Sequence, residues 1–259
     1  MIVYSVWGEL AREFPLPGSP QEAWSAETVT CSRRGWFGVQ AAPERLERKA
    51  EKDGTVILKG ATSIVIANAN GVSQTRVDSI GAIERVVLGG GGAQRPLGVA
   101  THIAASDSLL FVGTTDSERI QVLGADGRRR GVIRVPGSVR EPTGRHVDAA
   151  IEQIVAQIRG GIAQSIETRL KALTPPPRLP RWSGMVVDSE GYLWVTVSIP
   201  GDPMADVRVF DSAGVVIATV QLPGSVRLFE VGHDYVLATK FNADVGVAEV
   251  VELGLIRSK

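Results

Sequence analysis

Three histidines are the residues of this sequence best suited to bind a metal or transfer a proton near neutral pH. They are His102, His146 and His233, and no two of them have the short spacing of a metal site. His102 is predicted on the innermost strand of a sheet, where a central channel would be lined. We therefore take His102 as a candidate ligand-binding residue, together with Arg181 and Trp182, and assign no metal ligand.

The sequence lacks the motifs of nucleophilic catalysis. No G-x-S-x-G segment is present, so the strand–turn–helix elbow that exposes a catalytic serine is not expected. The single cysteine, Cys31, lies in a strand-like run before Arg33 and Arg34, and we interpret it as a small buried apolar residue. With one cysteine the chain forms no intrachain disulfide. We assign no catalytic residue.

A run of four glycines, Gly89 to Gly92, has the composition of a phosphate-binding loop. Such a loop needs a following Lys-Ser/Thr pair and a helix whose N-terminus faces the anion. Here Ala93-Gln94-Arg95-Pro96 follows, and a strand is predicted next. We interpret the run as a flexible loop between two sheets.

The elements that would position these residues are repeated hairpins. Three segments align on their Pro-Gly-Ser ends: IVYSVWGELAREFPLPGS, IQVLGADGRRRGVIRVPGS and VRVFDSAGVVIATVQLPGS. Gly8, Gly127 and Gly214 fall at the turns, where glycine readily supplies a positive φ. The proline that ends each copy cannot donate a ladder hydrogen bond, so it stops the strand or lies at an edge.

A second kind of hairpin precedes two of these copies. SGMVVDSEGYLWVTV and THIAASDSLLFVGT each read as an apolar strand, a tight polar turn and a second strand, and RLFEVGHDYVLATK is a third version. Two consecutive hairpins form a four-stranded antiparallel meander, and meanders repeated at roughly 40–45 residues are typical of propeller blades. We predict an all-β fold, a β-propeller of four-stranded antiparallel blades, as a single domain over residues 1–259.

We expect about four to five blade equivalents. Complete blades are predicted over residues 97–135 and 183–222, a third over 28–80, and three strands of another over 227–256. The opening hairpin, residues 2–16, would be the outer half of a further blade. Either the ring closes by joining these first strands to the last three, or the chain is N-terminally incomplete, which the start within a blade favours. The tryptophans are spaced as packing between blades requires: Trp7, Trp24, Trp36, Trp182 and Trp194.

Residues 144–180 depart from the β pattern. Their apolar residues recur at spacings of three and four, which indicates an amphipathic helix. Gly160-Gly161 is predicted to divide the segment into two helices, and the proline run 175–177 to end it. We interpret it as a helical insertion between two blades that packs on one face of the propeller. The alternative is a lid or partner-docking element, with Ile151, Ile158 and Ile162 as the candidate contacts.

Much of the sequence resembles a known group of proteins. The segments SGMVVDSEGYLWVTV, VRVFDSAGVVIATVQLPGS and VAEVVELGLI, and the middle IQVLGADGRRRGVIRVPG with its insertion and PPPRLP return, resemble uncharacterised bacterial six-bladed β-propeller proteins of the NHL-repeat and TolB-like kind. The resemblance covers about residues 86–256 and specifies fold rather than chemistry. It implies six blades and an extracytoplasmic location, periplasmic, secreted or as a lipoprotein, and it carries over no catalytic residue.

Charge and hydropathy argue against some classes of partner. Lys and Arg together number 28, as do Asp and Glu, so there is no net positive charge to attract nucleic acid. No stretch approaches the roughly 20 apolar residues that span a bilayer, and the N-terminus lacks the features of a signal peptide. We expect no nucleic-acid partner and no transmembrane segment.

The expected function is a non-catalytic propeller scaffold that binds a protein or a small ligand at the pore face, without a cofactor. The alternative is a metal-dependent propeller hydrolase or lactonase, with a divalent cation held in the channel by carboxylate and amide oxygens. The predicted inner strands offer few such groups, with Asp188 and Glu230 the best placed. A third possibility is a purely structural domain. Carboxylates converging on the channel would favour the enzyme, and an apolar patch beside the insertion would favour a protein partner.

Overall fold

The computed structural model describes residues 2–4, 10–13, 26–32, 34–41, 46–50, 55–68, 74–88, 91–137, 139–156, 158, 162–224, 226–242 and 247–256. These residues form nineteen strands and two helices, which confirms the predicted all-β propeller with a helical insertion. Several predicted features lie outside the described residues, namely Trp7, Gly8, Pro17, Trp24, Gly89, Gly90, Gly160 and Gly161.

Two sheets are the four-stranded meanders that the sequence predicts. The first contains β9 (Thr101–Ala105), β10 (Leu109–Thr114), β11 (Arg119–Gly124) and β12 (Arg129–Arg134). The second contains β13 (Gly184–Val187), β14 (Leu193–Thr196), β15 (Met204–Phe210) and β16 (Val216–Pro223). In both sheets the strands pair in chain order, so the first strand is innermost and the fourth is outermost.

The repeated hairpins are present as predicted. β11 pairs with β12 across Gly127, which has φ +73°, and β15 pairs with β16 across Gly214, which has φ +82°. The opening copy forms the antiparallel pair β1 (Ile2–Tyr4) and β2 (Leu10–Glu13). Glycine is favoured at both turns because positive φ is strained for residues with a Cβ atom.

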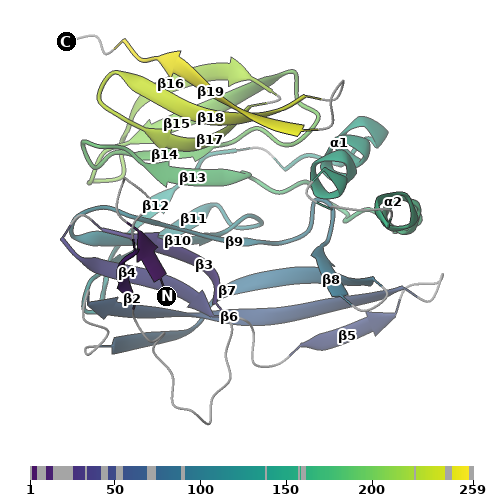
Figure 1. The fold of residues 1–259 in the computed structure, drawn as a ribbon, viewed down its shortest axis with the longest axis horizontal. Coiled ribbons are helices and arrows are strands. Elements are labelled where there is room, and N and C mark those ends of the chain that lie inside the picture. The colour runs from purple at the N-terminus through teal and green to yellow at the C-terminus, as the bar shows by residue number, and fades with distance from the viewer. Residues whose placement is uncertain are drawn as a thin grey trace.

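The C-terminal sheet has the three predicted strands. They are β17 (Val226–Val231), β18 (Tyr235–Asn242) and β19 (Val247–Gly254), paired in chain order. The inner strands of successive sheets are neighbours, because β3 contacts β9, β9 contacts β13, and β13 contacts β17. Four sheets therefore follow one another as blades, from the blue strands to the yellow ones in Figure 1.

The N-terminal blade is larger than predicted. It contains β3 (Ala26–Cys31), β4 (Trp36–Ala41), β5 (Glu47–Ala50), β6 (Val56–Asn68), β7 (Gln74–Leu88) and β8 (Gly91–Gln94). Its order is β3-β4-β6-β7-β8, with β5 paired to β6. β7 continues past the predicted end of this blade at residue 80 and turns back into β8. The prediction that the whole glycine run is a loop was wrong, because Gly91 and Gly92 pair with Leu88 and Val87.

Cys31 was predicted to be buried and is exposed instead. It is the last residue of β3, an edge strand that ends in the turn leading to β4. Neighbouring atoms still cover enough of the thiol for burial to raise its pKa above the ordinary value. A raised pKa lowers the thiolate fraction, so this cysteine is not activated as a nucleophile.

Apolar clusters that include tryptophan fill the spaces between neighbouring sheets. Trp36 packs with Ile64 of its own sheet and Leu110 of the next. Trp182 lies between Phe111 and Phe210, which belong to the two complete blades. Trp194 belongs to the cluster that joins the second complete blade to the C-terminal sheet: Ala205, Val207, Val209, Leu222, Val231 and Val236. The prediction that tryptophans pack between blades is confirmed for these three.

Each of these indoles also satisfies its N–H group. Trp36 donates to the carbonyl of Asp107 and Trp182 to that of Ser117, both at 2.9 Å. Trp194 donates to Oδ2 of Asp188 at 2.9 Å. A buried indole therefore contributes apolar area without leaving an unpaired donor, which would be costly between the sheets.

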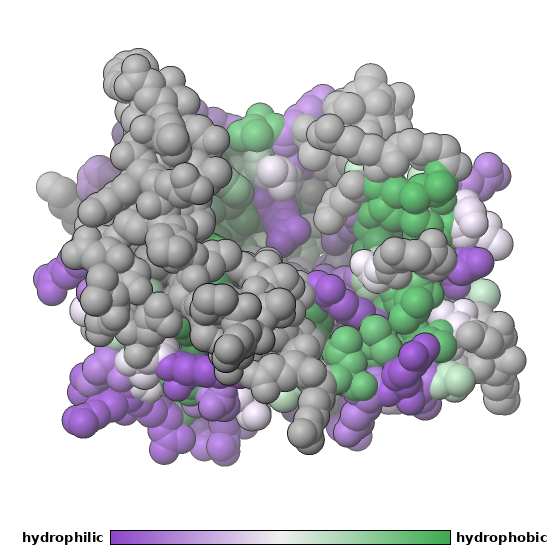
Figure 2. Space-filling view, turned by 60° about the horizontal axis from the view of Figure 1, so that its bottom comes forward, coloured by the Kyte–Doolittle hydropathy of each residue, from purple (hydrophilic) through white to green (hydrophobic). Residues whose placement is uncertain are grey.

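The helical insertion consists of α1 (Gly144–Val155) and α2 (Ala163–Lys171), between β12 and β13. Figure 1 shows both helices on one side of the blades, above β8. They pack on the end of the β7–β8 hairpin, in the cluster Val86, Leu88, Ile151, Leu170 and Leu173. Neither described helix has the length and apolar character needed to cross a membrane. Figure 2 shows that the face turned forward is hollowed near its centre, with hydrophobic and hydrophilic side chains both inside the hollow.

Two phenylalanines of contrasting burial test the packing between blades. Phe210 is 0% exposed between the two complete blades, whereas Phe229 on β17 is 69% exposed. We expect Phe210→Ala to lower the free energy of unfolding by about 3–5 kcal/mol, because it removes apolar contacts and leaves a cavity. Phe229→Ala is the control and is expected to change it by less than about 0.5 kcal/mol. Urea unfolding measures both, and equal effects would contradict this packing.

Candidate functional site

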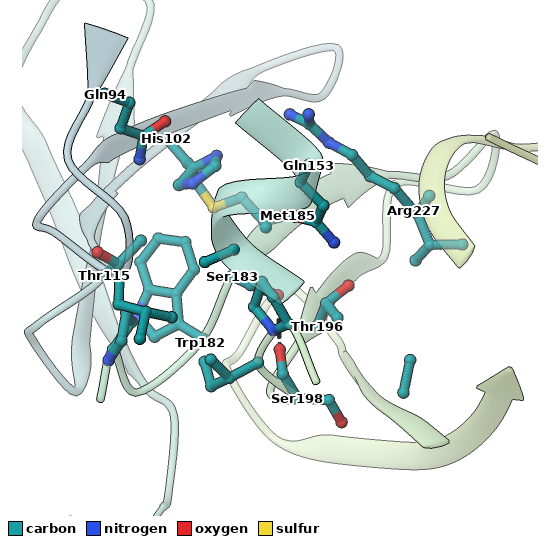
Figure 3. Close-up of a pocket in the computed structure, with 18 of the residues that line it drawn as sticks. Gln94, His102, Thr115, Gln153, Trp182, Ser183, Met185, Thr196, Ser198 and Arg227 are labelled. Atoms are coloured by element: carbon teal, nitrogen blue, oxygen red, sulfur yellow. Dashed lines mark hydrogen bonds between the residues drawn. The ribbon is translucent and has the colours of Figure 1, made fainter. Parts of the chain in front are cut away.

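A cavity of about 220 Å³ lies where the inner strands of three blades meet the insertion. β9 contributes His102 to its lining, β13 contributes residues 184–186, and β17 contributes residues 226–228. α1 contributes Ala150, Gln153 and Ile154. We call this space the axial cavity. Its walls thus come from segments that are far apart in the chain and that only the propeller brings together (Figure 3).

The axial cavity has polar groups on several of its walls. They belong to Gln94, Arg95, His102, Thr115, Gln153, Ser183, Thr196, Ser198 and Arg227. None of the described residues that line it is an aspartate or a glutamate. The lining therefore offers amide, hydroxyl and guanidinium groups, which suit a polar or anionic molecule better than a metal cation.

The axial cavity also has an apolar wall, to which Met185 and Ile154 contribute. Trp182 is 0% exposed and packs beneath this lining. The indole of Trp182 packs closely over Gly113 of β10, where a Cβ atom would lie 2.9 Å from the ring. The imidazole of His102 stands beside this indole, with ring centroids 5.4 Å apart and planes tilted by 53°. The buried indole thus supports the imidazole of His102 from beneath and offers a ligand no surface of its own.

His102 is neutral at pH 7. Burial disfavours the imidazolium and, together with the positive charge of Arg227, lowers the pKa of His102 to about 4. Its imidazole makes no hydrogen bond to another described residue. One ring nitrogen of the neutral form donates and the other accepts, so His102 can offer either role to a molecule in the cavity.

The lowered pKa of His102 predicts a specific loss of stability in acid. The unfolded imidazole, with a pKa near 6.5, binds a proton more readily than the folded one at about 4. Its contribution is therefore complete above pH 6.5 and is lost as the pH falls towards 4, by up to about 3 kcal/mol. We expect His102→Gln to flatten this part of the curve in urea unfolding at stepped pH. His233→Gln is the control, since its imidazole is 82% exposed, and an unchanged curve for His102→Gln would contradict the assignment.

The two arginines of the axial cavity differ in their pairing. Arg95 donates from Nη1 to Oε2 of Glu84 at 3.2 Å and from Nη2 to the carbonyl of Thr174 at 2.8 Å. Glu84 is also paired with Lys59. By contrast, the guanidinium of Arg227 makes no hydrogen bond or ion pair with a described residue, and Figure 3 shows it extending from the side opposite His102. Arg227 is thus the uncompensated charge of this lining.

An ion-pair network fixes the start of α1 beside the axial cavity. Arg140 donates to both carboxylate oxygens of Asp202, at 3.0 and 2.9 Å, and the N–H of Ile199 donates to Oδ2 at 2.9 Å. His146 approaches the same carboxylate with Nε2 at 3.3 Å, while its Nδ1 accepts from the N–H of Thr143 at 3.0 Å. Since Nδ1 accepts, Nε2 carries the proton. Residues before and within α1 are in this way tied to the β14–β15 connection.

Asp202 is the centre of this network. Burial alone would raise the pKa of its carboxyl group, but hydrogen bonds from Arg140 and from the Ile199 N–H outweigh burial and lower the pKa to about 2. A lowered pKa means that the ionised form stabilises the fold above about pH 4, and that this contribution is lost as the pH falls to 2. The start of α1 is therefore held by charge at neutral pH.

We expect Asp202→Asn to loosen α1 without unfolding the blades. The amide cannot replace the charge-assisted bonds to Arg140, so amide exchange in residues 147–155 should become about 10-fold faster. Hydrogen exchange followed by mass spectrometry measures this change. Asp211→Asn is the matched control, because that carboxylate caps the β15–β16 turn, where it accepts from the N–H groups of Ala213 and Val215. Faster exchange in the blades but not in α1 would contradict the assignment.

The structure brings two of the three predicted ligand-binding residues together. His102 and Trp182 both line the axial cavity. Arg181 does not, because its Nη1 donates to the carbonyl of Gly137 at 3.2 Å and lies 4.0 Å from the Glu118 carboxylate. Arg181 lies in a bend before β13, where its side chain is directed to Gly137 while that of Trp182 packs in the core.

The three isoleucines expected to contact a partner have different environments. Ile151 is 1% exposed and packs against α2 and the β7–β8 hairpin. Ile158 is partly buried, and Ile162 is 60% exposed. Of these three, Ile162 alone presents most of its side chain to solvent, so the part of the insertion that the structure describes offers no patch centred on them.

Sequence reasoning considered Asp188 and Glu230 as oxygen ligands, and neither lines the axial cavity. Asp188 accepts hydrogen bonds from the N–H of Tyr192 and the indole of Trp194, both at 2.9 Å. Glu230 accepts from the hydroxyl of Tyr235 at 2.6 Å. Within the described ranges, no group of three or more His, Cys, Asp and Glu residues is arranged to hold a metal ion.

Sequence reasoning missed Gln94, Gln153 and Arg227. The first is on β8, which was not predicted, and the second is a polar position between the apolar residues of α1. The sequence could have identified Arg227 as a candidate site residue, because it is a charged residue within the predicted inner strand RLFEV. A charge at an inner strand of a propeller faces either a neighbouring blade or the channel, and the channel is the less costly place for it.

Comparisons with known proteins give no family for this chain. No family model matches the sequence, and no curated protein sequence matches it. Among solved structures, a protein of unknown function from Bacteroides caccae is 12% identical, with 96% of this chain and 83% of that chain covered and a TM-score of 0.38. A luciferin-regenerating enzyme is 15% identical, with coverages of 92% and 75% and a TM-score of 0.35. At these values we draw nothing about function from either likeness.

Proposed function

We propose that this protein is a non-catalytic β-propeller that binds a small molecule in the axial cavity. The observation that carries the proposal is the convergence of hydrogen-bonding side chains from the inner strands β9 and β17 and from α1 on one cavity that also has an apolar wall. Ligand sites commonly combine an apolar lining with a few placed polar groups and lie where several elements meet. The start of α1, held by Asp202, positions Gln153 over this space.

A binding role is better supported than the alternative of a metal-dependent hydrolase or lactonase. A divalent cation of the hard type prefers carboxylate, carbonyl and water oxygens. The described lining contributes two arginines and no carboxylate, so its charge opposes such a cation. A protein partner at the insertion is also less supported, since Ile151 is buried and Ile158 partly so.

We also propose that residues 1–259 act as one propeller domain and that residues 144–180 are its insertion. Kinship with bacterial six-bladed propellers of the NHL-repeat and TolB-like kind, and an extracytoplasmic location, rest on the sequence resemblance. The described residues supply four blades. No nucleic-acid partner is proposed, because the chain has no net charge.

A cavity-filling variant tests the proposed function. Gly184 lines the axial cavity, and a Cβ atom built there meets no atom within 4 Å. We expect Gly184→Leu to fold and to abolish binding of benzoate, benzamide and benzylamine, offered as a mixture and followed by saturation-transfer NMR. The wild type should bind at least one of the three compounds.

Gly131→Leu is the matched control for this experiment. Gly131 lies on the outermost strand β12, and a Cβ atom there also meets nothing within 4 Å. This variant should bind as the wild type does. Equal saturation transfer to Gly184→Leu and Gly131→Leu would show that the compounds bind elsewhere, and no transfer to any of the proteins would count against a small-molecule site.

A further inference from the structure

The charge of the axial cavity has one sign. Arg95 and Arg227 are its charged lining residues among those described, and both are cations. Arg95 is neutralised by Glu84, whose carboxylate is buried with it. Arg227 has no acidic partner among the described residues. Among the described residues, the cavity therefore presents one positive charge that has no acidic partner.

A guanidinium has a preferred kind of partner. Its planar fork of N–H groups matches a carboxylate or phosphate group, with two parallel hydrogen bonds that are stronger than neutral ones. Arg227 is exposed, so a ligand can reach its guanidinium, and the paired hydrogen bonds rather than exclusion of water favour an anion there. The charge of Arg227 thus selects an anion over a neutral or cationic molecule of the same shape.

The rest of the lining limits what else the anion carries. The cavity has a volume of about 220 Å³ and is partly open to solvent. Met185 and Ile154 form an apolar wall that a bare inorganic ion would leave uncovered. The amides of Gln94 and Gln153 and the hydroxyl of Ser183 add uncharged hydrogen-bonding positions.

We infer that the axial cavity binds a small organic acid, with its carboxylate on Arg227 and its apolar body against Met185 and Ile154. This inference rests on the proposed function and adds the chemical class of the ligand. It accounts for the unbalanced guanidinium and the apolar wall together, since neither an inorganic anion nor a neutral apolar molecule uses both.

Three compounds of nearly equal shape distinguish the contribution of ligand charge to binding from the contribution of ligand shape. Benzoate, benzamide and benzylamine are titrated separately into the protein, and the indole N–H resonance of Trp182 is followed by NMR. We expect benzoate to bind at least about 10-fold more tightly than benzamide, and benzylamine to bind more weakly still. Inorganic phosphate serves as an anion without an apolar body and should shift this resonance little.

Substitution of Arg227 tests whether this residue causes the preference for benzoate over benzamide. Arg227→Gln should weaken benzoate binding about 10- to 100-fold and leave benzamide binding within about 2-fold. Arg227→Lys keeps the charge but loses the two-pronged geometry, so an intermediate loss is expected, and it serves as the second variant should the glutamine variant fold poorly. Arg129→Gln, at an exposed arginine of β12 outside the cavity, is the matched control and should behave as the wild type.

The outcomes separate the two levels of the proposal. Benzamide binding as tightly as benzoate, or Arg227→Gln retaining the preference for benzoate, would overturn the organic-acid inference while leaving a small-molecule site in place. Inorganic phosphate binding as tightly as benzoate would overturn the role of the apolar wall. No response of the Trp182 resonance to any of the compounds would remove the proposed function together with its ligand class.

Discussion

The burial of apolar surface between neighbouring sheets is the constraint on which the rest of this structure depends. Each complete blade is apolar on both faces and would expose both of them if it stood alone. Stacking the blades removes both faces from water, and Trp36, Trp182 and Trp194 occupy the spaces between them. This stacking brings β9, β13 and β17 side by side. The axial cavity is therefore a product of the same packing that stabilises the fold.

The charge of the residues that line the axial cavity differs from the net charge of the chain. The chain carries 28 basic and 28 acidic residues, yet the described lining of the axial cavity contains arginines and no acid. Glu84 sits behind this lining and neutralises Arg95. Composition therefore excludes a large net charge but says nothing about a single guanidinium placed at the junction of three blades.

Features set by neighbouring residues were predictable from the sequence. The alternation and turn glycines of the repeated hairpins identified β11–β12 and β15–β16, and the three-four spacing identified both helices, because these signals are local. The sequence analysis did not predict β8, because this strand begins with two glycines, which have no side chains to show the alternation of apolar and polar residues. The different directions of Arg181 and Trp182, and the channel-facing position of Arg227, depend on how blades are oriented against one another. Pairing shifts by one residue between Leu228 and Glu230, and such a shift changes which side chains face the axis.

The helical insertion stands on the β7–β8 hairpin, beyond the strands that make up the repeated blades. It is also tied to the blades, because Ala150 packs with Leu97 and Ile199, and Arg140 beside α1 bonds to Asp202. Gln153 belongs to this attached part, whereas Arg227 belongs to the ring of inner strands. Gln153 is exposed on α1, so its side chain can be exchanged without disturbing the inner strands to which Arg227 belongs.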